Sequence, residues 1–142
     1  MNREVIREKI GSDIYFTCVR DDKFRSSRVS VNFVVPLREN SASVNAIVPY
    51  ILRRGSADYP DFQRLNEKLA ELYGASLYAD VRKIGDAQIL NLSVESLNNR
   101  YALDGEDIAA QSAQLILSLL LNPKIKDGGF PADDLRIEKK AL

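Results

Sequence analysis

The chain carries few side chains that could perform catalysis together. It has 142 residues, no histidine and a single cysteine. Without histidine, the chain cannot supply a histidine zinc ligand, a serine–histidine or cysteine–histidine nucleophile pair, or a histidine general base. Cys18 has no second cysteine with which to form a disulfide or a metal-binding pair. It lies in an apolar run at residues 14–19, which predicts a small core residue rather than a reactive thiol.

The charges of the chain are balanced, with 20 basic and 20 acidic residues. No net field therefore attracts nucleic acid or an anionic membrane. A local basic cluster is interrupted by Asp21 and Asp22, and we interpret it as a solvated loop rather than a phosphate site; it consists of Arg20, Lys23, Arg25 and Arg28. The first residues do not form the apolar stretch typical of a signal peptide, and no apolar run approaches the roughly 20 residues of a membrane span. We expect a cytoplasmic protein with no nucleic-acid or membrane partner.

Residues 45–60 are the stretch around which we expect the other elements to be arranged. Apolar residues at helical spacing predict a helix over residues 46–52 that packs on a sheet; they are Val44, Ile47, Val48, Ile51 and Leu52. Pro49 lies inside this run and is expected to kink or split the helix, at a cost of roughly 3 kcal/mol if unrelieved. Arg53 and Arg54 follow, and they either form a solvated helix end or bind an acidic partner surface.

The other elements predict an α+β protein. Alternating or β-branched runs predict strands at residues 5–10, 14–19, 29–37, 76–84 and 87–94. The short links between the first three favour an antiparallel meander, and Gly85-Asp86 between the last two predicts a tight hairpin turn. Helices are expected from Pro60, from Asp107 to Asn122, and from Pro131. The expected order is β-β-β-α-α-β-β-α-α, an antiparallel sheet with helices packed on one face. We expect one domain over residues 1–142 that is incomplete at its C-terminal end.

The helical patterns also predict which side chains point inward. In the helix from Pro60 these are Phe62, Leu65, Leu69, Leu72 and Tyr73. In the next helix, the run at residues 115–121 is apolar nearly all round, which predicts deep burial against the sheet. In the last helix, Leu135 and Leu142 are expected to face inward.

Several local strings resemble the M16 metallopeptidase family, the group of insulinase, pitrilysin and the mitochondrial processing peptidase. The strand at residues 29–37 is similar to the family's strand before its first long helix. Ile-Leu-Arg-Arg-Gly-Ser at residues 51–56, followed by Tyr59 and Pro60, resembles the segment after the family's metal motif. Residues 69–75, 117–123 and 135–138 resemble its second helix and a later helix-loop-helix. The resemblance implies an M16 peptidase-like fold of the LuxS-like metallohydrolase type.

The resemblance also implies that the metal site is lost. Active members carry His-x-x-Glu-His on the first helix, where two histidines on one face bind zinc and the glutamate acts as the base. The matching positions here hold Ala46 and Tyr50 as the ligands and Pro49 as the base. We therefore expect no catalytic residue, no metal and no cofactor. The family's third ligand, a glutamate two turns beyond the position of Glu138, would fall after Leu142.

A peptide-binding role stays open at the sheet edge. The family adds an extended peptide to an edge strand, and residues 74–81 match that strand in position, with the family's Asn-Ala pattern only partly present. The candidate contacts are Ala75, Ser76, Leu77, Tyr78 and Ala79; the alternative is an ordinary hairpin strand.

Three functions follow from these expectations. The first is an inactive M16-like subunit or fragment that binds peptide and helps present it to an active peptidase subunit, or that acts as a homodimer. The alternative is a peptide-binding or scaffolding domain without a peptidase partner. An active zinc metallopeptidase is the least favoured.

Overall fold

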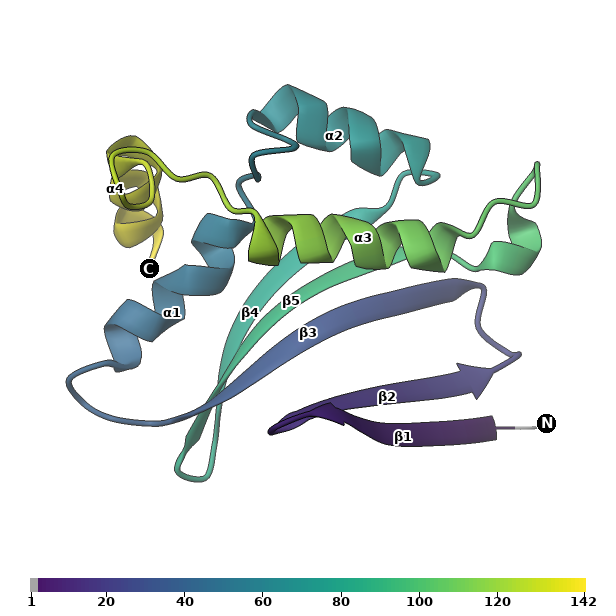
Figure 1. The fold of residues 1–142 in the computed structure, drawn as a ribbon, viewed down its shortest axis with the longest axis horizontal. Coiled ribbons are helices and arrows are strands. Elements are labelled where there is room, and N and C mark those ends of the chain that lie inside the picture. Colours follow the sequence, from purple (N-terminus) through teal and green to yellow (C-terminus); the bar gives the residue numbers. More distant parts are fainter. Residues whose placement is uncertain (1–2) are drawn as a thin grey trace.

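The protein is described by a computed structural model that covers residues 3–142 (Figure 1). Within these residues, five strands and four α-helices follow one another in the predicted order, with one short 3-10 helix, η1, added. The strands are β1 (Arg3–Gly11), β2 (Ile14–Asp21), β3 (Ser26–Pro36), β4 (Ser76–Ile84) and β5 (Ala87–Leu97). The helices are α1 (Ala42–Leu52), α2 (Phe62–Glu71), η1 (Asn99–Tyr101), α3 (Ile108–Leu121) and α4 (Ala132–Ala141). The predicted α+β class with antiparallel strands and helices is confirmed.

The main sheet has the strand order β3-β5-β4, and all its pairs are antiparallel. β5 is the central strand, and its residues are buried or half-buried throughout. The predicted tight turn joins β4 to β5 through Gly85 and Asp86, since Ile84 pairs with Ala87. Gly85 has a φ of +57°, which a residue without a β-carbon adopts most easily.

The predicted three-stranded meander is wrong. β1 and β2 form a separate two-stranded sheet, and within the described residues β2 does not pair with β3. The link between them is tied to η1 instead: Arg100 Nη2 donates to the carbonyls of Asp22 at 2.7 Å and Phe24 at 2.8 Å. The N–H of Asn98 also donates to the Arg25 carbonyl at 2.9 Å. The backbone of this short link is thus hydrogen-bonded to Arg100 and Asn98. A short link alone does not make two strands pair.

Two helices, α2 and α3, begin at residues that cap them. Asp61 accepts a hydrogen bond from the Arg64 N–H at 2.8 Å, and Asp107 accepts one from the Ala110 N–H at 2.9 Å. Of the kink or split expected at Pro49, the split is wrong, because α1 is one helix with Pro49 inside it. The helix runs from Ala42 to Leu52 and so begins before the expected residue 46. Pro49 lacks only one intrahelical donor, and its ring is buried, which offsets part of the cost.

The core lies between one face of the main sheet and the helices α1, α2 and α3. Its members are Leu52, Leu65, Leu72, Leu92, Val94, Ile108, Leu115, Ile116 and Leu119. α3 packs against β5 and β3, and α1 packs against β5, β4 and α4. Figure 1 shows the helices on one side of the curved main sheet. No helix within residues 3–142 is both long and apolar enough to cross a membrane.

Four side chains that the helical patterns predict to be inward are exposed in the structure: Val44, Phe62, Leu121 and Leu142. Val44 and Phe62 lie in the first turns of their helices, and Leu121 and Leu142 lie at the far ends. Periodicity marks the apolar face of a helix but does not show where the opposing sheet ends. Leu117 is exposed as well, so α3 is buried along one face rather than all round.

We expect that Leu119→Ala will lower the free energy of unfolding by roughly 2–5 kcal/mol, because it leaves a cavity in the core. Leu121→Ala provides the matched control on the same helix, since Leu119 is 0% exposed and Leu121 is 74% exposed. The control should stay within about 0.5 kcal/mol of the parent protein. Urea denaturation followed by circular dichroism measures both values. Equal losses in the two variants would contradict the assignment of the core.

Candidate functional site

The first candidate site is the surface of α1 that carries Ala46, Pro49 and Tyr50. Ala46 and Tyr50 are four residues apart and therefore share one face of the helix. Both are half-buried, and Pro49 is buried. Ala46 has no polar side-chain atom and Pro49 has neither a carboxylate nor a backbone N–H, so two of the three positions hold no group that could bind an ion or move a proton. Within residues 3–142 no cluster of histidine, cysteine, aspartate and glutamate is arranged to hold a metal ion.

Tyr50 packs against the side chain of Arg53. The guanidinium carbon of Arg53 lies 5.5 Å from the centre of the Tyr50 ring, one helical turn away. A guanidinium over an aromatic face is stabilised by roughly 0.5–1 kcal/mol at an exposed site. The phenol and guanidinium therefore form a small polar surface at the C-terminal end of α1. The acidic-partner interpretation of Arg53 stays a prediction.

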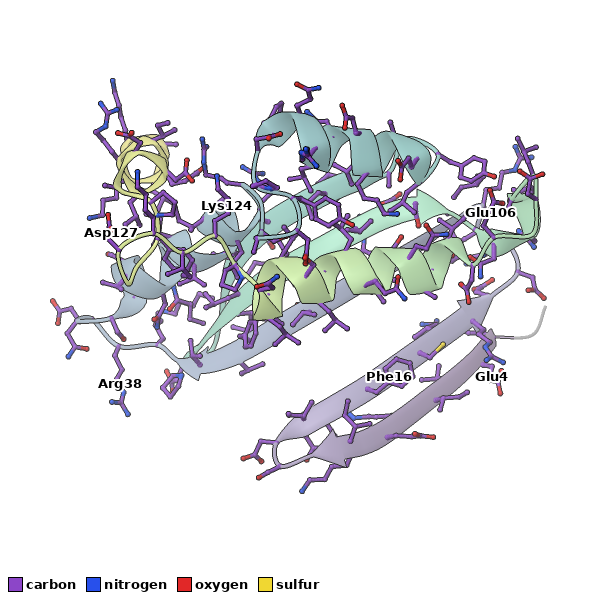
Figure 2. The ribbon with its side chains drawn as sticks, turned by 45° about the horizontal axis from the view of Figure 1, so that its top comes forward. Glu4, Phe16, Arg38, Glu106, Lys124 and Asp127 are labelled. Atoms are coloured by element: carbon purple, nitrogen blue, oxygen red, sulfur yellow. The ribbon has the colours of Figure 1, made fainter. Side chains whose placement is uncertain are left out.

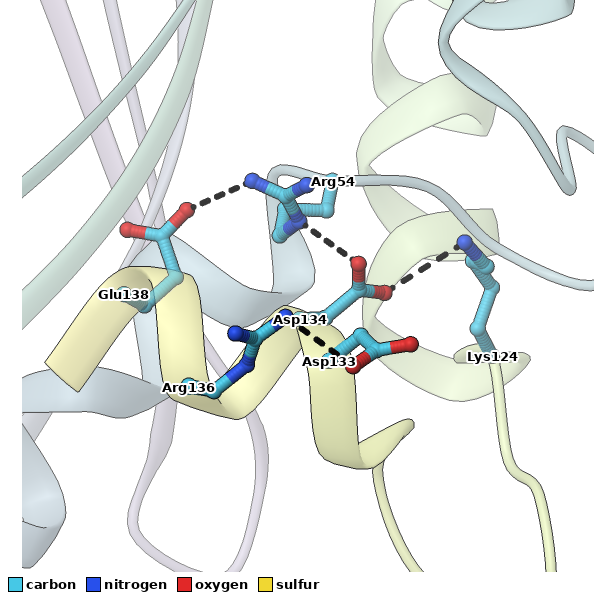
Figure 3. A network of polar contacts seen from close by, with 6 residues as sticks. All are labelled: Arg54, Lys124, Asp133, Asp134, Arg136 and Glu138. Atoms are coloured by element: carbon cyan, nitrogen blue, oxygen red, sulfur yellow. Dashed lines mark hydrogen bonds and ion pairs between the residues drawn. The ribbon is translucent and has the colours of Figure 1, made fainter. Parts of the chain in front are cut away.

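Arg54 has a different role, which the sequence interpretation missed. Its Nε lies 3.0 Å from Asp134 Oδ1, and its Nη1 lies 3.0 Å from Glu138 Oε1 (Figure 3). Lys124 Nζ reaches the other oxygen of Asp134 at 3.4 Å. Burial lowers the pKa of Arg54, but hydrogen bonds and charges from Glu138 and Asp134 raise it more, so the net pKa lies above its usual range. Arg54 therefore neither ends in solvent nor is free for a partner, and it joins α1 to α4.

One signal of this network is present in the sequence. Asp134 and Glu138 are four residues apart, so both carboxylates lie on one face of α4 and can reach a single guanidinium. Glu138 is buried, which requires a paired cation. The spacing could have indicated that a cation binds here. It could not identify Arg54, which lies 80 residues before Asp134 in the chain.

The segment after α1 is fixed to the end of α3. Gly55 has a φ of +148°, and a β-carbon there would lie 2.4 Å from the Tyr59 carbonyl oxygen, so only glycine fits without a shift. Ser56 is fully buried, and its Oγ lies 2.8 Å from Ser118 Oγ. Ser118 in turn donates to Asp58 Oδ2 at 2.5 Å. The Gly-Ser segment is therefore a structural joint between α1 and α3.

The second candidate site is the outer edge of β4. Among the described strands β4 pairs with β5 alone, so its other edge is unpaired. Ser76, Leu77, Tyr78 and Ala79 all lie in this strand, with Leu77 and Ala79 packed against the core. Ala75 precedes the strand, and its N–H donates to the Leu69 carbonyl at 2.9 Å. The structure thus brings four of the five predicted residues to one edge, and their contact with a peptide stays a prediction.

Tyr78 stands on the face of the sheet opposite the helices. Its ring is 45% exposed, and the guanidinium carbon of Arg28 lies 5.6 Å from the ring centre. Arg28 also binds Glu95 at 2.6 Å, which places one positive charge of β3 across β5 from the edge. The pKa of Glu95 is lowered, first by the hydrogen bond from Arg28. α1 packs against β4, so the helix that carries Ala46, Pro49 and Tyr50 lies next to the strand with the unpaired edge.

No family model matches this chain, and two of the proteins similar to it are informative. One is the "Probable inactive metalloprotease YmfF" of Bacillus subtilis (strain 168), which is 27% identical over 124 residues. The match covers 87% of this chain and 29% of that protein. The other is the crystal structure of a conserved protein from Enterococcus faecalis V583, with a TM-score of 0.90 and 25% identity over 96% of this chain. This second match covers 32% of the Enterococcus faecalis chain, so the present chain spans about a third of the length of each relative.

We expect that Arg54→Gln will lower the free energy of unfolding by roughly 1–3 kcal/mol, because Glu138 is left buried without its cation. The matched control is Arg53→Gln, the neighbouring arginine, which loses only its contact with Tyr50 and should cost about 1 kcal/mol or less. Urea denaturation at neutral pH measures both. If Arg53→Gln were the more damaging change, the network would not hold α4 in place.

Acid should weaken the joint at Asp58. Hydrogen bonds from Ser118 and then Asn122 lower the pKa of Asp58 in the folded protein. A carboxylate with a depressed folded pKa stabilises the fold above its unfolded pKa, about 3.9, and this contribution disappears as the pH falls through the folded pKa. The stability difference between the parent protein and Asp58→Asn should therefore be present at pH 7 and shrink on acidification. A difference that does not change with pH, measured by urea denaturation, would contradict this.

Proposed function

We propose that this protein is a non-catalytic, metallopeptidase-like chain that holds an extended peptide along the edge of β4 and presents it to an active peptidase. Similarity to a probable inactive metalloprotease supports the coarser part, a non-catalytic peptidase-like protein. The finer part concerns the peptide and the partner. The observation that carries it is the combination, on neighbouring elements, of a helix without ligands and a strand with a free edge.

The edge of β4 has the chemistry that an extended peptide requires. Its unpaired backbone N–H and C=O groups can continue the antiparallel ladder that β5 begins, which is the β-augmentation mode of recognition. Side chains of the added strand would alternate between the two faces of the sheet. On one face they meet the side of Tyr78, and on the other they meet α1, where Tyr50 and Arg53 lie. Binding would need no metal, and peptide would leave uncut.

Peptide binding can be tested with a fluorescein-labelled peptide of alternating valine and lysine, by fluorescence anisotropy. The same peptide with alternate amides N-methylated lacks the backbone donors and should bind more than about tenfold more weakly, since each lost backbone hydrogen bond costs roughly 0.5–1.5 kcal/mol. Tyr78→Ala should weaken binding by up to about fivefold, because a cross-strand aromatic contact contributes roughly 0.2–1 kcal/mol. Tyr101→Ala is the matched control, since the two rings are 45% and 42% exposed.

Two results would contradict the proposal. Equal binding of the two peptides would show that backbone pairing is not involved. Stoichiometric zinc in the purified protein, together with peptide cleavage that a chelator stops, would contradict the non-catalytic assignment. Co-purification with a chain that bears His-x-x-Glu-His supports presentation to a peptidase, whereas peptide binding without such a complex supports a scaffolding role.

A further inference from the structure

The β1–β2 hairpin is exposed on both of its faces. Its strands pair with each other, and neither packs substantially against another element of the described chain. Six large apolar side chains on the hairpin are more than half exposed: Val5, Ile10, Ile14, Tyr15, Phe16 and Val19. Figure 2 shows Phe16 on this hairpin, away from the helices. An isolated hairpin is marginally stable in water, and contiguous apolar surface marks an interaction site.

The hairpin leaves two unpaired strand edges toward the same space. β2 pairs with β1 on one side, β3 pairs with β5 on one side, and no ladder joins β2 to β3 in residues 3–142. Figures 1 and 2 both show β2 and β3 side by side but separate, running in opposite directions from the link that joins them. Arg100 and Asn98 hold the backbone of that link, so the separation is fixed by specific bonds.

The helix above this space offers an apolar side. α3 lies between α2 and the outer part of β3 in Figure 1. Gln111 bonds to Lys68 of α2, and Ser118 bonds to Asp58 just before α2, which marks the side of α3 toward α2. At 100° per residue, Ala113, Leu117 and Leu120 fall on the other side, and Leu117 is exposed. A strand placed next to β3 would find apolar partners there.

A similar fold is present within a much longer protein. The Enterococcus faecalis structure matches 96% of this chain with a TM-score of 0.90, so the two share their overall fold over that region. The matched region is 32% of that chain, and the larger part of its polypeptide lies outside it. A second copy of the present chain is a poor occupant. An inserted strand needs both of its edges free, and each of the strands β1 to β5 already has one edge paired.

We propose that β2 and β3 together form an acceptor for one extended strand, and that this strand comes from the kind of polypeptide that the longer relatives carry outside the matched region. Insertion would join the two sheets into one, in the order β1-β2-inserted strand-β3-β5-β4. Because β2 and β3 run in opposite directions, the inserted strand is parallel to one and antiparallel to the other, and the completed sheet is mixed. This site is separate from the β4 edge.

The test supplies a polypeptide of this kind in trans. The 142-residue chain is mixed with the part of the Enterococcus faecalis protein that lies outside the match, produced as a separate polypeptide. Size-exclusion chromatography with light scattering detects the complex, and hydrogen exchange followed by mass spectrometry locates it. We expect a one-to-one complex in which amides of β2 and β3 exchange at least about tenfold more slowly, while those of β4 are unchanged.

A pair of matched variants tests the location independently. Val19 of β2 and Ile84 of β4 are both exposed aliphatic strand residues, at 51% and 60%. Val19→Asp should weaken the complex by about tenfold or more, because it buries a charge beside the inserted strand, and Ile84→Asp should not. Circular dichroism confirms that both variants fold. The proposal is overturned by the absence of a complex, by slower exchange in β4 alone, or by a dimer of the chain itself that protects β2 and β3.

Discussion

β5 is hydrogen-bonded along both of its edges, and the positions of the other elements follow from this pairing. β3 pairs with it over residues 26–36 and β4 over residues 76–84, so β3 and β4 necessarily become the edges of the main sheet. The buried face of β5 receives α3 and α1, which supply much of the core. The unpaired backbone groups of a sheet edge can bind another strand. Both proposed binding sites are consequences of a three-stranded sheet with one central strand.

The contacts of α1 that the structure describes are structural ones. Ala46 and Pro49 offer no ligand or base, and Arg54 at its end binds Asp134 and Glu138 of α4. Gly55 and Ser56 then fix the chain to α3. Packing and ion pairs therefore hold the helix in place. Such a scaffold can still display peptide beside α1, because the β4 edge depends on β5 and not on a metal.

Local patterns in the sequence predicted most of the elements and their starts. Asp61 and Asp107 cap helices as expected, and Gly85 with Asp86 makes the expected turn, because these signals depend on neighbouring residues alone. The pairing of β2 was predicted wrongly, because Arg100, which holds the link, is 78 residues from Asp22. That Ala46 and Pro49 offer no metal ligand or base follows directly from residue type. The Arg54 network could not, since it depends on which helices meet in space.

The central claim is that an extended peptide binds at the edge of β4 in a chain that holds no metal. Hydrogen exchange of the metal-free protein, compared with and without the alternating valine–lysine peptide, tests it most directly. The account predicts slower exchange in β4, where new backbone hydrogen bonds form, and unchanged exchange in β1 and β2. Exchange in β4 that is unaffected at saturating peptide, or that slows only after zinc is added, would contradict it.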